Sequence, residues 1–172
     1  VRLGCLPTPI HAWAPPGDGF EGVECFIKRD DLSGCDVSGN KVRKLEFLLA
    51  AAMDGDYDSV ITIGGTQSNH ARATAVASRQ MGLDPHLILR GPASQNLSQT
   101  LTGNLLFDRL VGSKLYPVTP AVYEMEGQEK LCNELQVKLE AEGKKPYVVP
   151  VGGSNHIGAW GYMQAVQELM EQ

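Results

Sequence analysis

The sequence predicts an α/β fold, in which helices cover both faces of a parallel β-sheet. Short runs of β-branched and apolar residues alternate along the chain with longer helical stretches. Glycine-rich turns follow two of these runs directly, at GGTQSNH (64–70) and VGGSNHIG (151–158). With 172 residues, 42% of them hydrophobic, the chain can bury the core that such a sheet needs. Ligands of this fold class gather at the carboxyl ends of the strands, where both turns are expected.

The first elements follow a proline-rich entry. VECFIKRDD (23–31) predicts a strand that runs into an acidic turn. SGNKVRKLEFLLAA (38–51) predicts an amphipathic helix with Asn40 as its N-cap. The apolar positions of this helix recur at spacings of three, four and three, which places them on one face. These positions are Val42, Leu45, Leu49 and Ala52.

The elements that follow continue the alternation. DSVITIGG (58–65) predicts a β-branched strand that ends in a glycine pair. The stretch 68–82 is expected to be a helix, with Ser68 as its cap and Gly82 at its end. The remaining elements are a strand at 85–90, a surface loop at 91–103, a helix at 103–112, a strand at 113–118, a polar helix at 121–142, a strand at 147–153 and a helix from 156 onward.

Charge and hydropathy exclude several classes of protein. The net charge is -5 and the pI about 5.3, with Lys and Arg scattered, so the sequence offers no surface for nucleic acid or for an anionic membrane. No apolar run approaches the roughly 20 residues of a membrane-spanning helix. The opening segment lacks the apolar stretch of a signal peptide. A cytoplasmic protein is therefore expected.

The cysteines and the chain ends carry two further expectations. Cys5, Cys25, Cys35 and Cys132 form no C-x-x-C pair and have no histidine at ligand spacing, so free thiols and no metal are expected. The sequence lacks an initiator methionine and stops inside GYMQAVQELMEQ, a predicted amphipathic helix. The chain is therefore expected to be part of a longer protein.

The first turn of the helix at 38–51 carries three cations, Lys41, Arg43 and Lys44. A helix N-terminus has a partial positive charge, so each cation there costs roughly 0.3–1 kcal/mol. Lys41 and Lys44 share a face, where a bound phosphate would pair with Lys44. A neighbouring cation and partial burial favour the neutral amine of Lys41 that a Schiff base needs. The alternative is a solvated basic turn that lies over the core.

The turn GGTQSNH combines a glycine pair with polar side chains. The glycines allow a sharp turn, and the free N–H groups of the next helix point into the same crevice, which suits a carboxylate or a phosphate. Ser68 and Asn69 can add directed hydrogen bonds. The alternative is a plain helix cap, since the turn lacks the G-x-G-x-x-G spacing of dinucleotide sites. His70 is a candidate acid or base, or else an ordinary residue of the first helical turn.

Two other features are predicted to serve the structure. Arg43 points away from the lysine face, so a salt bridge to Asp30 or Asp31 is expected. In the motif that follows the last strand, Gly158 and Gly161 lie three residues apart, which allows a helix to approach the sheet closely. This role is favoured over direct ligand contact.

From about Val23 onward the chain resembles the amino-terminal half of the pyridoxal-phosphate enzymes that comprise D-cysteine desulfhydrase and 1-aminocyclopropane-1-carboxylate deaminase. The motifs that carry the resemblance are IKRDDLSGCDVSGNKVRKLEFLLA, IGGTQSNHARATAVASRQMGL, GNLLFDRLVG and VPVGGSNHIGAWGY. The resemblance implies the tryptophan-synthase-β-like fold (fold type II), in which a large cofactor domain and a smaller α/β domain enclose the site. Residues 1–44 would then belong to the large domain, residues 45–158 to the small domain, and residues 159–172 to the return into the large domain.

The resemblance also implies a role for each site residue. Lys41 is the Schiff-base lysine, and Lys44 is similar to the lysine that reaches the phosphate of the cofactor, pyridoxal 5'-phosphate. Asn69 is similar to the asparagine that hydrogen-bonds the ring hydroxyl of the cofactor. Ser68, with the amides of Asn69 and His70, resembles the group that holds the substrate carboxylate. Ser68 can also assist proton movement, so Lys41 and Ser68 are the expected catalytic residues.

The implied reaction is a β-elimination on a small D-amino acid, with D-cysteine giving pyruvate, sulfide and ammonia. His70 favours the desulfhydrase branch, because Gln commonly follows Ser-Asn in the deaminase branch. The 1-aminocyclopropane-1-carboxylate deaminase reaction is the alternative within this class. A half-enzyme that acts as a non-catalytic binding module is the alternative outside it. A homodimer is expected for the longer protein.

Overall fold

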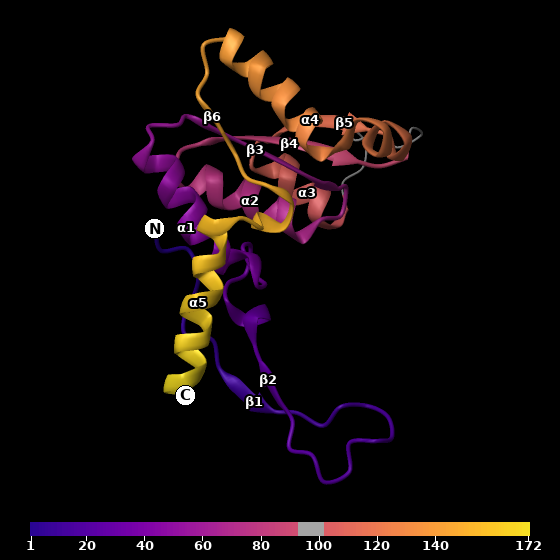
Figure 1. The fold of residues 1–172 in the computed structure, drawn as a ribbon, viewed down its shortest axis with the longest axis vertical. Helices are drawn as coiled ribbons and strands as arrows, with labels where there is room; N and C mark the ends of the chain where they lie inside the picture. Colours follow the sequence, from indigo (N-terminus) through magenta and orange to yellow (C-terminus); the bar gives the residue numbers. More distant parts are fainter. Residues whose placement is uncertain (93–101) are drawn as a thin grey trace.

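The computed structural model describes residues 1–92 and 102–172, and from Lys41 onward strands and helices alternate as predicted (Figure 1). The strand Ile10–Ala12, in the proline-rich entry, was not predicted. Most of the predicted surface loop at 91–103 lies outside the described residues. The elements are β1 (Ile10–Ala12), β2 (Phe26–Lys28), η1 (Asp30–Leu32), α1 (Lys41–Asp54), β3 (Ser59–Gly65), α2 (Asn69–Gln80), β4 (Asp84–Arg90), α3 (Gly103–Leu110), β5 (Lys114–Val118), α4 (Pro120–Ala141), β6 (Pro146–Val148), η2 (Val151–Gly153) and α5 (His156–Glu171).

The main sheet is parallel, with the strand order β5-β4-β3-β6. The chain places β3, β4 and β5 side by side and then returns to lay β6 along the other edge of β3. The direction of winding therefore reverses between β3 and β6. In open α/β sheets the crevice beyond the carboxyl ends of two such strands is the usual ligand site.

Helices cover both faces of this sheet, which confirms the predicted fold class (Figure 1). Ile61 and Ile63 of β3 pack with Ile88 of β4 against α4. Leu87 and Leu89 of β4 point to the opposite face, where they pack against α2 and α3. The two faces arise because successive side chains of a strand point in opposite directions.

Helix α1 has the predicted apolar stripe but not the predicted cap. Val42, Leu45, Leu49 and Ala52 are all 0% exposed. The prediction that Asn40 caps the helix is wrong, because its backbone is already helical (φ -62, ψ -13) and its side chain donates to the Tyr162 hydroxyl instead. A capping residue needs an extended backbone to direct its side chain at the free N–H groups.

Three predicted elements are shorter or less regular than expected. Strand β2 has only 3 residues and pairs antiparallel with β1 in a separate small sheet, because the turn η1 follows almost at once. Strand β6 ends at Val148, because Pro150 follows and Gly152 and Gly153 adopt φ +65 and +63. These positive φ values are incompatible with an extended strand. Helix α4 is interrupted at Gly127, where φ is 76 and ψ is 159.

Helix α5 leaves the sheet and packs across α1 (Figure 1). A Cβ atom on Gly161 would lie 2.3 Å from the carbonyl oxygen of Arg43, and one on Gly158 would lie 2.0 Å from that of Gly153. Both glycines therefore serve a close approach, as predicted, since any side chain would collide with backbone. The predicted partner is wrong: the glycines meet α1 and the turn after β6, because α5 crosses α1 instead of lying on the sheet.

Candidate active site

The two glycine-rich turns come together at the carboxyl ends of β3 and β6. The segment after β6 is tied to β3, since Val149 donates its N–H to the Ile61 carbonyl (2.9 Å) and the Thr62 hydroxyl donates to the Val149 carbonyl (2.9 Å). The first turn of α1 lies against this segment. A Cβ atom on Gly152 would be 3.8 Å from Cε of Lys41, which places that side chain at the turn. The carboxyl ends of β3 and β6 and the first turn of α1, with Lys41 and Lys44, therefore meet at one place.

Lys41 and Lys44 are half-buried neighbours, and no carboxylate of the described residues lies within 4.0 Å of either ammonium. The Nζ atom of Lys44 donates to Ser154 Oγ at 2.9 Å and lies 5.5 Å from the centre of the Tyr162 ring. Burial, and then the charge of Lys41, lowers the pKa of Lys44 below its ordinary value. Two cations at a helix N-terminus with no counter-charge can hold an anion such as a phosphate.

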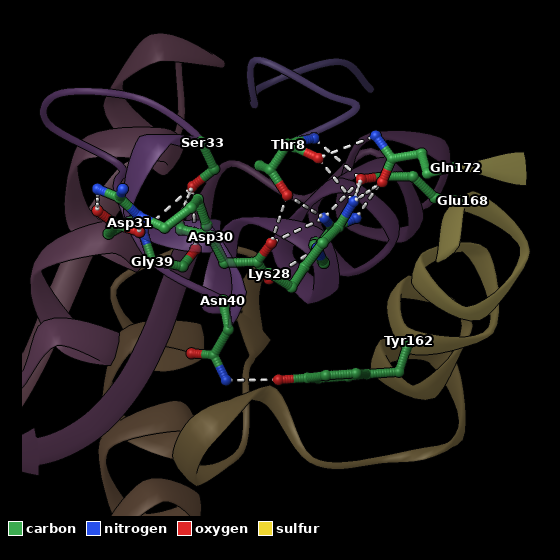
Figure 2. Close-up of polar contacts among 12 residues, drawn as sticks. Thr8, Lys28, Asp30, Asp31, Ser33, Gly39, Asn40, Tyr162, Glu168 and Gln172 are labelled. Atoms are coloured by element: carbon green, nitrogen blue, oxygen red, sulfur yellow. Dashed lines mark hydrogen bonds and ion pairs between the residues drawn. The ribbon is translucent and has the colours of Figure 1, made fainter. Parts of the chain in front are cut away.

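Arg43 lies on the same helical turn but belongs to a separate, buried network. Figure 2 labels its carboxylate partners, Asp30 and Glu168. Its guanidinium pairs with Asp30 at 2.8 Å and with Glu168 at 2.9 Å. The predicted bridge to Asp30 is therefore confirmed, whereas Asp31 pairs with Arg29. Glu168 was not expected, because nothing in the local sequence links α1 to a residue 125 positions away.

Ser68 forms the predicted helix cap. Its backbone is extended (φ -72, ψ 120), and its Oγ accepts a hydrogen bond from the N–H of Ala71 at 3.2 Å. The turn before it needs glycine, because a Cβ atom on Gly64 would lie 2.9 Å from the Ser68 side chain. The hydroxyl is half-buried at the start of α2, beside the free N–H groups of the helix.

Asn69 is exposed at the same helix start, and its amide is held from the side by α3. The Nδ2 atom of Asn104 donates to Asn69 Oδ1 at 2.8 Å. Asn104 was not predicted as a site residue. The available signal was its position directly after Gly103, at the start of a predicted helix, where a polar side chain can contact a neighbouring turn. Ser154 and Tyr162, the partners of Lys44, were missed as well, because both lie more than 100 positions along the chain from it.

His70 is buried, with 5% of its surface exposed. Its Nε2 lies 3.0 Å from the hydroxyl of Thr62, the residue that also bonds the segment after β6. Burial, and to a smaller degree the charge of Lys41, lowers the pKa of His70 to about 4. The ring is therefore neutral at neutral pH and fastens α2 to β3. The N–H of His70 lies in the first turn of α2, where a carboxylate site is predicted.

The described residues show no membrane span and no metal cluster. Among residues 1–92 and 102–172, no helix has the length and apolar character needed to cross a membrane. In the same ranges, no three His, Cys, Asp or Glu side chains gather where a metal ion could bind. All four cysteines are unpaired.

Comparison with known proteins gives this geometry its chemical context. The family model described as "Pyridoxal-phosphate dependent enzyme" matches residues 1–172. The chain belongs to this family. The fold of this pyridoxal-phosphate enzyme chain is accordingly fold type II, and its cofactor is pyridoxal 5'-phosphate. The half-buried amine of Lys41 fits the aldehyde of that cofactor, and the uncompensated charge of Lys44 at the start of α1 fits its phosphate.

Relatives cover the whole chain but are longer. The chain is 56% identical to the bifunctional D-cysteine desulfhydrase/1-aminocyclopropane-1-carboxylate deaminase of Arabidopsis thaliana, over 99% of this chain and 42% of that protein. It is 44% identical to a putative 1-aminocyclopropane-1-carboxylate deaminase of Pyrococcus abyssi, over 99% and 50%. A solved deaminase homologue superposes with a TM-score of 0.83 at 40% identity, over 99% and 50%. The chain thus spans about half the length of the relatives it matches.

Proposed function

We propose that the protein containing this chain is a pyridoxal-phosphate-dependent lyase that converts D-cysteine and water to pyruvate, sulfide and ammonia. The observation that carries the proposal is the pair of lysines at the crevice between β3 and β6, Lys41 and Lys44, which have no carboxylate within 4.0 Å among the described residues. The relative from Arabidopsis thaliana, whose name includes D-cysteine desulfhydrase, supports this substrate.

Each site residue has a distinct task in this proposal. Lys41 would hold the cofactor, and its amine, when free, would remove the proton from the substrate Cα. Lys44 and the start of α1 would hold the phosphate, and Asn69 would bind the ring oxygen. Ser68, with the N–H groups of Asn69 and His70, holds the substrate carboxylate and assists proton movement. When bound, the cofactor supplies the electron sink that makes the α-proton acidic.

The test uses the full-length protein that contains this chain, loaded with pyridoxal 5'-phosphate. Reduction with borohydride should attach the cofactor to the peptide that contains Lys41, as read by mass spectrometry. Lys41→Ala should abolish both the attachment and sulfide release from D-cysteine. Lys114→Ala, which removes an exposed lysine on β5, is the matched control and should change neither. Retention of both by Lys41→Ala would refute the proposal.

The 1-aminocyclopropane-1-carboxylate deaminase reaction is a second candidate, because the names of both curated relatives include that activity. Turnover of D-cysteine and of the cyclopropane substrate by one preparation decides between them. A non-catalytic binding module is a third candidate, from outside this class of enzyme. A stable monomer of the chain's own mass, with no cofactor absorbance, would favour the module.

The organisation of the longer protein is also part of the proposal. Residues 1–44 and 159–172 belong to a large cofactor domain, and residues 45–158 form the small domain. The position of the parallel sheet, whose strands all lie between Ser59 and Val148, supports this division. The assembly is a homodimer and the compartment is the cytoplasm, although the relative from Arabidopsis thaliana is named as mitochondrial. Sizing in solution and cell fractionation test these two points.

A further inference from the structure

A network of amide groups joins the turn before α2 to the start of α3. The backbone N–H of Asn104 donates to Gln67 Oε1 at 2.9 Å, and Gln67 Nε2 donates to the carbonyl of Thr102 at 3.2 Å. The side chain of Asn104 reaches back from α3 to the turn before α2. Its Nδ2 donates both to the backbone carbonyl of Gln67 and to Oδ1 of Asn69, each at 2.8 Å.

Backbone groups fix the orientations of the Gln67 and Asn104 amides, and Asn104 in turn fixes that of Asn69. A carbonyl only accepts and a backbone N–H only donates, so the orientations of Gln67 and Asn104 are each set by a partner that cannot be reversed. Because Asn104 must direct its NH₂ group at the Gln67 carbonyl, the same NH₂ group faces Asn69. The atom of Asn69 that meets it must therefore be the acceptor, Oδ1.

We infer that Asn104 is a positioning residue that fixes the polarity of the Asn69 amide, so that Asn69 presents an N–H donor to the site. With Oδ1 occupied by Asn104, only the NH₂ group of Asn69 is left for a ligand. The ligand atom that it selects is an acceptor oxygen, and a negatively charged oxygen above all. This inference rests on the proposed function, in which that atom is the ring oxygen of pyridoxal 5'-phosphate.

The start of α3 is shaped to make this contact. Gly103 has φ +57, and a Cβ atom there would lie 2.3 Å from Gln67 Oε1. Only glycine at position 103 lets the Gln67 side chain come close enough to accept from the N–H of Asn104. Gln67 thus satisfies a free N–H at the start of α3, where Thr102 forms no side-chain cap. Asn104 is half-buried and Asn69 is exposed, so the network ends at the open side of the turn.

The experiment compares the binding of two probes to the full-length protein that contains this chain. Pyridoxal 5'-phosphate carries the ring oxygen, and its 3-deoxy analogue lacks it but keeps the aldehyde and the phosphate. Wild-type protein should bind the first probe more tightly. Asn104→Ala should weaken binding of pyridoxal 5'-phosphate by about tenfold, the size expected for one hydrogen bond. It should change binding of the 3-deoxy analogue by less than about twofold.

Asn104→Asp sharpens the test because it reverses polarity without changing shape. A carboxylate opposite Asn69 Oδ1 turns the amide round, so that the ring oxygen meets a carbonyl oxygen. The preference for pyridoxal 5'-phosphate over the analogue should then disappear. In an Asn69→Ala background the same substitution should have no further effect on this preference, since Asn104 acts only through Asn69. Binding of the analogue by each variant reports that the site is folded.

The outcomes separate this inference from the proposed function. Equal weakening for both probes in Asn104→Ala would mean that Asn104 only supports the fold, and it would overturn the inference. A preference for pyridoxal 5'-phosphate that survives in both Asn104 variants would overturn it as well. If wild-type protein binds both probes equally, the proposed role of Asn69 fails, and the inference fails with it.

Discussion

The first turn of α1 contains two kinds of cation, and the structure treats them in opposite ways. Arg43 has a side chain only 1% exposed and is neutralised by Asp30 and Glu168. Hydrogen bonds to both carboxylates hold the pKa of Arg43 above its ordinary value. Lys41 and Lys44, on the neighbouring face, have no carboxylate partner among the described residues.

This difference teaches how one helical turn can serve the fold and the site together. Neighbouring positions on a helix point in different directions, so Arg43 reaches the N-terminal segment and α5 while the lysines reach the crevice. Thr8 joins the buried network by donating from Oγ1 to Asp30 (2.8 Å) and from its N–H to Glu168 (2.9 Å). The paired charges tie three segments to α1. The unpaired charges leave the helix start ready for an anion.

The largest expected effect comes from removing the paired cation. Arg43→Met leaves Asp30 and Glu168 facing each other with one compensating charge fewer, and breaking a buried pair costs about 3–5 kcal/mol. Urea unfolding should show this loss of stability as a lower midpoint concentration of urea. Arg29→Met is the matched control, because its partner Asp31 is exposed on the surface; it should cost no more than about 1 kcal/mol. Equal losses for the two variants would show that the network does not hold α1 in place.

A smaller effect should appear as the pH is lowered. The hydrogen bond from Arg43, with further bonds from Lys28 and Thr8, lowers the pKa of Glu168 to about 2. A carboxyl group whose pKa is lower in the folded chain stabilises the fold above its unfolded pKa, and this stabilisation is lost as the pH falls toward the folded value.

Unfolding free energies measured between pH 5 and 2 should therefore fall by about 1–2 kcal/mol more in wild type than in Glu168→Gln, which has no proton to gain. Glu171→Gln, an exposed residue of the same helix, is the control and should follow the wild type. If the unfolding free energy of Glu168→Gln fell with pH as steeply as that of the wild type, a group other than Glu168 would be responsible for the loss.

The comparison also separates what the sequence could and could not predict. The apolar stripe of α1, the Ser68 cap and the bridge from Arg43 to Asp30 follow from short-range patterns, and the structure bears them out. Glu168 could not be predicted, because its pairing depends on how α5 crosses α1. Local periodicity contains no information about such a crossing.

The errors have the same origin. Asn40 is a good capping residue by type, but the chain enters α1 through a backbone that is already helical, and Asn40 bonds Tyr162 of α5. The close approach of Gly161 was predicted, yet its partner is the backbone of Arg43 and not the sheet. In both cases the residue type is informative, and the partner is decided by tertiary packing. Asn104 is a third example, since its role appears only when α3 lies beside the turn before α2.

The smallest expected effect has the opposite sign and concerns the unpaired cations. Lys44→Met removes one of two like charges at a helix N-terminus, which should stabilise the ligand-free chain by about 0.3–1 kcal/mol at low ionic strength. The lost bond to Ser154 offsets part of this gain. Added salt should reduce the effect, because it screens the repulsion between these half-buried charges in part. Lys28→Met, a lysine paired with Glu168, is the control and should destabilise. A clear loss in Lys44→Met would mean that this charge serves the fold, as Arg43 does.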